Sequence, residues 1–174
     1  MTNLIKKQGI GTWISLGTLL LAVLGLILYG SAISNGMNLT IASGSDPFYL
    51  ADRPADAAMM SMVVTCGVLS VLFLAAAIVL GQLKLDGIVG TIVNAISGAM
   101  RIVVPALLFA TLLNFLYGSL TGIAWTFFSN EELAIYPEAI AVANTVITGI
   151  VFLAIAMIAS VVASFFNLIK KEKA

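Results

Sequence analysis

Four long apolar stretches constrain the fold of this chain more than any other feature of its sequence. They cover about residues 10–30, 57–81, 99–126 and 138–168. Each reaches the ~20 residues that an α-helix needs to cross the hydrocarbon core of a bilayer. The sequence therefore predicts an all-α polytopic membrane protein. We expect residues 1–174 to form a single membrane domain, folded as a bundle of four transmembrane helices.

The composition agrees with a lipid environment. Hydrophobic residues make up 61% of the 174 residues and charged residues only 9%, whereas about 25% of a soluble domain is charged. The first stretch follows Lys6 and Lys7, as the apolar part of a signal peptide would. Its apolar run exceeds the ~7–15 residues found in signal peptides, so we expect it to be retained as a membrane span.

The basic residues divide unequally between the two sides of the predicted bundle. One side holds the termini and the 82–98 connection, and the other holds residues 31–56 and 127–137. The first side carries Lys6, Lys7, Lys84, Arg101, Lys170, Lys171 and Lys173. The second side has Arg53 alone. Because basic residues concentrate on the cytoplasmic side of membrane proteins, the sequence predicts that both termini are cytoplasmic, in the plasma membrane.

The connections between the spans differ in character. Residues 83–98 carry apolar residues at helical spacing, as an amphipathic helix does. This inner segment either lies in the membrane interface or continues into the third span and packs against a neighbouring subunit. We favour continuation, because no proline interrupts the chain between residue 83 and Pro105. The outer loop, residues 31–56, is rich in Gly, Ser and Asn, and its alternating run "MNLTIA" could form a small hairpin.

The sequence excludes several kinds of chemistry. The chain has no histidine and a single cysteine, Cys66, so histidine-based catalysis and intrachain disulfides are ruled out. No ionisable residue lies near the middle of a predicted span, where proton-coupled transport or intramembrane proteolysis would need one. The net charge of zero gives no electrostatic basis for binding nucleic acid. We expect no enzymatic activity, no cofactor and no nucleic-acid partner.

A soft-metal site is one narrow alternative. Met59, Met62 and Cys66 fall on one face of a helix, and sulfur ligands suit Cu(I). Methionine is also an adaptable packing residue, and we favour packing as the role of these side chains.

Uncharged polar and small residues form stripes on the third and fourth spans. They are Thr111, Asn114, Gly118, Gly122, Asn144, Thr145, Thr148, Ala156, Ser160 and Ser164. Small residues let helix backbones approach closely, and polar side chains hydrogen-bond between helices. The stripes either pack the bundle of one chain or form a subunit interface or polar pathway in an oligomer.

Arg101 stands at the start of the third span. Counting ~20 residues inward from the aromatic residues near Trp125 places the inner membrane boundary close to Arg101. We therefore predict that Arg101 is an interfacial anchor that reaches toward lipid phosphates. Tyr29 is likewise expected at a membrane boundary, and Pro105 is expected to mark a kink.

Two functional hypotheses fit these features. The first is a non-enzymatic membrane protein that acts through helix-mediated assembly, as a homo-oligomer or as a small subunit of a membrane complex. The alternative is a small oligomeric channel or uniporter, with a polar pathway lined by residues of the third and fourth spans. In both cases the expected partners are the lipid bilayer and other membrane subunits.

Overall fold

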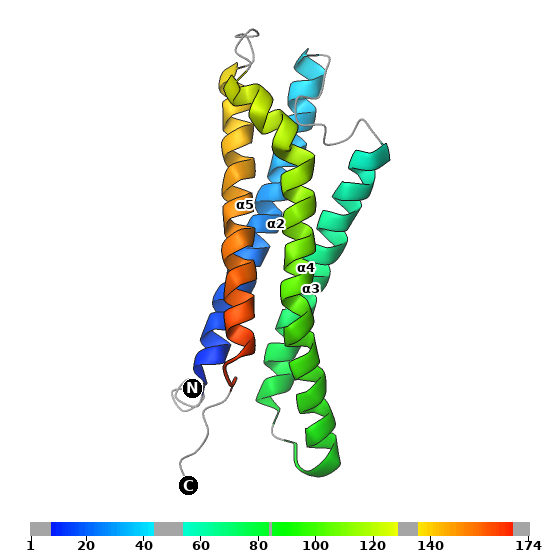
Figure 1. Ribbon diagram of the computed structural model, residues 1–174, viewed down its shortest axis with the longest axis vertical. Helices are drawn as coiled ribbons and strands as arrows, with labels where there is room; N and C mark the ends of the chain where they lie inside the picture. The colour runs from blue at the N-terminus through cyan, green and yellow to red at the C-terminus, as the bar shows by residue number, and fades with distance from the viewer. Residues whose placement is uncertain (1–7, 44–53, 84, 129–135, 169–174) are drawn as a thin grey trace.

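Four long helices make up the described part of the chain. The computed structural model describes residues 8–43, 54–83, 85–128 and 136–168. The helices are α2 (Ile10–Ser43), α3 (Pro54–Gln82), α4 (Gly87–Phe128) and α5 (Tyr136–Ser164), and they run up and down along one long axis (Figure 1). All four are long and apolar enough to cross a membrane. The chain is thus a four-span, all-α integral membrane protein, whose apolar helices contact the lipid bilayer.

The helices pack as two antiparallel pairs. The most extensive contacts join α2 to α5, and these two helices are called the first pair; α3 and α4 form the second pair. The pairs meet mainly through α4 and α5, whereas α2 and α3 contact each other less. Figure 1 shows α3 leaning away from α2 toward the end opposite the first turn of α2.

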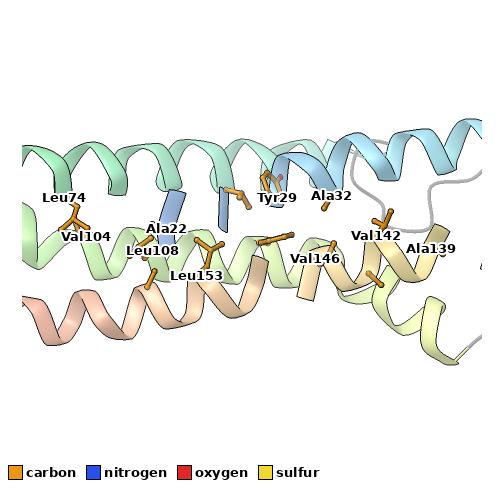
Figure 2. Packing of buried hydrophobic residues seen from close by; sticks show 14 residues of the cluster. Ala22, Tyr29, Ala32, Leu74, Val104, Leu108, Ala139, Val142, Val146 and Leu153 are labelled. Carbon is orange, nitrogen blue, oxygen red and sulfur yellow. The ribbon is translucent and has the colours of Figure 1, made fainter. Parts of the chain in front are cut away.

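Buried residues recur at spacings of three and four along the helices. On α2 they include Ser15, Thr18, Ala22, Tyr29 and Ala32. This 3.5-residue average is the repeat that keeps a seam in contact in left-handed helical bundles. The buried positions of α5 follow the same spacing, in Ala139, Val142, Val146, Leu153, Ala156, Ser160 and Ala163. Figure 2 shows apolar members of both series, among them Ala22, Tyr29, Val142 and Leu153, arranged along the bundle core.

Two glycines allow the close approach of α5 to its neighbours. A Cβ atom on Gly25 of α2 would lie 2.7 Å from Cγ of Leu153. A Cβ atom on Gly149 of α5 would lie 2.9 Å from Cε1 of Phe115. Both distances are too short for real side-chain contacts, so the helix spacing here depends on glycine.

Helix α2 is longer than the sequence predicts. The expected span ends near residue 30, but the helix continues to Ser43 and includes the "MNLTIA" run, so that run is helical and forms no hairpin. Ala32 is fully buried in the same cluster as Ala139 and Val142 of α5 (Figure 2). Packing on α5 therefore outweighs the weak helix preference of the Gly- and Asn-containing segment. The remainder of the predicted outer loop, residues 44–53, lies outside the described residues.

Tyr29, the residue expected near a membrane boundary, lies in the interior of the bundle. Its side chain is buried, and its ring meets that of Phe115 edge-on, with 4.8 Å between ring centroids. The ring contributes to the core of the bundle, where edge-to-face aromatic pairs are favourable.

The predicted inner segment and the third span form one continuous helix, α4. The helix begins at Gly87, whose φ of 70° favours glycine, and runs through Pro105 without ending. Ser97 donates a hydrogen bond of 2.9 Å to the carbonyl of Ala77 on α3, and this bond fixes the two helices on either side of their short connection. The first turns of α4 extend beyond the ends of the other helices (Figure 1).

Candidate functional site

Four of the predicted stripe residues lie inside the bundle of a single chain. Thr111 and Gly122 of α4 and Ala156 and Ser160 of α5 are all buried. The Thr111 hydroxyl donates to the carbonyl of Leu107 at 2.8 Å, so it is satisfied within its own helix. These positions pack the helices of one chain against each other.

The other stripe residues lie nearer the surface. Asn114, Gly118, Thr145 and Ser164 are half-buried, while Asn144 and Thr148 are exposed on α5. A Cβ atom on Gly118 would meet only Sδ of Met59, at 3.9 Å. Gly118 is therefore not a point of close helix approach. Taken with the buried residues, the predicted set occupies both the interior and the exterior of the bundle and does not converge on one surface.

The predicted sulfur residues lie on α3. Met62 is exposed and Cys66 is half-buried. In the described ranges, no group of three or more His, Cys, Asp or Glu side chains lies close enough together to hold a metal ion.

The densest polar contacts join the first turn of α2 to the end of α5. The Gly9 amide donates to the Leu168 carbonyl at 2.7 Å, and the Gly11 amide donates to the Asn167 carbonyl at 3.2 Å. The Thr12 hydroxyl also donates to the Leu168 carbonyl, at 2.6 Å. A helix start leaves N–H groups unpaired and a helix end leaves carbonyls unpaired. Here each end supplies the partners that the other lacks.

Two glutamines connect α2 to α3 at the same end. The side-chain amides of Gln8 and Gln82 hydrogen-bond to each other in both directions, at 3.0 and 2.8 Å. Nε2 of Gln82 lies 3.5 Å from the Thr12 hydroxyl. The Leu168 side chain is buried beside Gly81, where an added Cβ would collide with its Cδ1 atom. The end of α3 thus joins the same cluster.

Arg101 of α4 completes this cluster. Its Nη2 atom donates to the carbonyl of Ala163 and, at 2.7 Å, to the carbonyl of Phe166. A cation at the C-terminal end of a helix is favourable, because the helix dipole and the unpaired carbonyls both attract it. The side chain that the sequence assigns to lipid phosphates therefore has protein carbonyls as its partners. We call this cluster the end junction. It consists of residues Gln8–Thr12, Gln82, Arg101 and Ala163–Leu168.

Two buried polar atoms at this end of the bundle are unsatisfied. Within the described residues, the Ser15 hydroxyl and Nε of Arg101 are buried without a hydrogen-bond partner. Ser15 lies one helical turn beyond Gly11, on the same face of α2. Buried polar atoms are nearly always paired, so these two mark the junction as incompletely satisfied.

Sequence reasoning singled out Arg101 only as an anchor to lipid phosphates, and it did not single out Gln8, Thr12 or Gln82. One available signal was the position of the two glutamines, one before the first span and one at the end of the second. Comparison with protein-family models, with curated proteins and with solved structures finds no match to this chain.

Proposed function

We propose that this chain is a non-enzymatic membrane protein that acts by assembling with other membrane subunits, either copies of itself or the components of a larger complex. The proposed location is the plasma membrane, with both termini in the cytoplasm. The excess of Lys and Arg in the segments around the end junction supports this orientation.

The exposed apolar ridge at the start of α4 carries the proposal. Ile88, Val89 and Ile92 are 79%, 60% and 53% exposed. Helix α4 has 42 residues, which correspond to about 63 Å of helix, twice the ~30 Å hydrocarbon core. The first turns of α4 extend beyond the other helices (Figure 1). The ridge therefore needs a cover other than the hydrocarbon core that surrounds the four spans. Exposed apolar ridges of this kind are typical of protein interfaces.

The first prediction concerns the assembled mass. In nanodiscs or mild detergent, light scattering after size exclusion should give a protein mass that is a multiple of 18.2 kDa, or a mass shared with a copurifying subunit. Replacing Ile88 and Ile92 together with alanine should weaken assembly about tenfold, because two large side chains leave the ridge.

Leu20→Ala is the matched control. Leu20 is equally exposed on α2 but lies within the membrane-spanning part of the bundle, so its truncation should leave the mass unchanged. A wild-type particle that stays monomeric in nanodiscs would contradict the proposal.

A small oligomeric channel or uniporter is the second candidate. The exposure of Asn144 and Thr148 on α5 favours it, since an oligomer could bring these polar groups around a shared axis. We expect liposomes containing the protein to show ion or solute flux if this candidate is correct. We further expect Asn144→Leu to reduce the flux and Thr65→Val, an exposed position on α3, to leave it unchanged. Liposomes without flux at every tested potential would eliminate the channel.

A further inference from the structure

Hydrogen bonds between the two helix pairs gather in the end junction. Gln82 of the second pair bonds to Gln8, which lies just before α2 of the first pair, separated from it by Gly9. Arg101 of the second pair bonds to the carbonyls of Ala163 and Phe166, at the end of α5. These bonds are directional and come apart in discrete steps, unlike a packed apolar contact.

Further along the bundle the two pairs are held by van der Waals packing of side chains against glycines. Phe115 of α4 lies against Gly149 of α5, and Leu26 of α2 lies against Gly67 of α3. Such contacts are non-directional, and small movements of packed helices preserve most of them. The end opposite the junction is also where α3 leans away from α2 (Figure 1). The junction is therefore the place where the relative position of the pairs is fixed.

The segment that receives these bonds is the non-helical end of the described chain, Phe165–Leu168. Its carbonyls accept from Arg101 of α4 and from Gly9, Gly11 and Thr12 at the start of α2. Its Leu168 side chain is buried against Gly81 of α3. A single short segment thus contacts all three other helices at this end.

The closed arrangement leaves polar groups unpaired. Within the described residues, Nε of Arg101 is buried without a partner, although Nη2 of the same guanidinium is bound. The Ser15 hydroxyl is also buried without a hydrogen-bond partner among the described residues. Each unpaired group lowers the stability of the closed state relative to an open state in which water or lipid headgroups satisfy it.

We propose that the segment Phe165–Leu168, Arg101 and Gln82 form a releasable clasp that switches the bundle between two states. In the closed state the clasp holds the two helix pairs together at the end where α2 begins. In the open state Arg101 leaves the α5 carbonyls, and the pairs separate at this end while their apolar contact near Phe115 and Gly149 persists. The clasp goes beyond assembly, because it operates within one chain.

Hydrogen–deuterium exchange of the full chain in nanodiscs tests the clasp. Arg101→Met keeps the side-chain stem but removes the donors, so amides in residues 9–16 and 160–168 should exchange about tenfold faster. Exchange near Phe115 should not change. Arg101→Lys, which keeps the charge but not the forked geometry, should give an intermediate rate. Ser164→Ala is the matched control, because the Ser164 hydroxyl bonds only to Val161 within α5.

A crosslinked variant tests the same idea with a covalent link in place of the Gln8–Gln82 hydrogen bonds. In a Cys66→Ala background, Gln8→Cys and Gln82→Cys joined by a short bis-maleimide should slow exchange of residues 160–168 below the uncrosslinked rate. Slower exchange in the crosslinked protein supports opening of the pairs. Exchange unchanged by the crosslink, or equal in wild type, Arg101→Met and Arg101→Lys, overturns the clasp. Either result is independent of the oligomeric mass.

Discussion

Replacing Gly11 with alanine is expected to destabilise the bundle by about 3 kcal/mol, the sum of a steric clash and a lost hydrogen bond. An added Cβ would lie 2.6 Å from the Phe166 carbonyl oxygen and 2.7 Å from that of Asn167. Both obstacles are backbone atoms, which cannot rotate away as a side chain can. The start of α2 must therefore move off α5, which also breaks the bond from the Gly11 amide to Asn167.

Gly17→Ala provides the matched comparison on the same helix. A Cβ atom at Gly17 meets nothing within 4 Å. Alanine also favours a helix over glycine by up to about 1 kcal/mol, so this change should be neutral or slightly stabilising. Equilibrium unfolding in mixed micelles with increasing SDS measures both variants. Equal unfolding midpoints for Gly11→Ala and Gly17→Ala would show that the contact between Gly11 and the end of α5 has room for a Cβ atom.

Truncating Phe115 to alanine is the second large expected effect, a loss of about 2 kcal/mol. Phe115 is 1% exposed and contacts Tyr29 and the position of Gly149 at the meeting of three helices. Within a membrane, an unfolded span keeps its apolar side chains in lipid, so the transfer term seen in soluble cores largely disappears. What is lost is packing, because the cavity leaves the surrounding atoms without contacts.

Phe109→Ala is the control for this prediction. Phe109 lies on the same helix but is 49% exposed, facing away from the core. Lipid chains can fill the space that its truncation leaves, so its unfolding midpoint should stay close to that of the wild type. A midpoint lowered equally by both truncations would contradict the assignment of Phe115 to the core.

The features that sequence reasoning recovered are those with a local or periodic signal. Apolar length alone predicts four spans. The regular spacing of small residues singles out Thr111, Ala156 and Ser160, but it leaves open whether they pack one chain or form a subunit interface. The extension of α2 to Ser43 escaped prediction, because it depends on the burial of Ala32 against α5. No local pattern distinguishes the tight glycine Gly149 from the open Gly118, since their difference lies in the neighbouring helix.

The partners of Arg101 escaped prediction for a related reason. Its acceptors are backbone carbonyls, the first of them 62 residues further along the chain. Every residue carries a carbonyl, so the sequence gives no sign of which ones are left unpaired by a helix end and turned toward a cation. The sequence shows that Arg101 stands at the start of a span, but only the fold shows what the guanidinium binds.

The hydroxyl groups inside the bundle have a mechanical consequence. Thr18, Thr111, Ser119 and Thr126 each donate to a carbonyl of their own helix. Each hydroxyl therefore carries its acceptor with it when its helix turns or slides, and no hydrogen bond needs to break. Ser97 is different, because it is tied to α3. Most of the interior of this protein therefore lets its helices turn or slide without breaking hydrogen bonds. The hydrogen bonds that join different helices lie toward one end of the bundle.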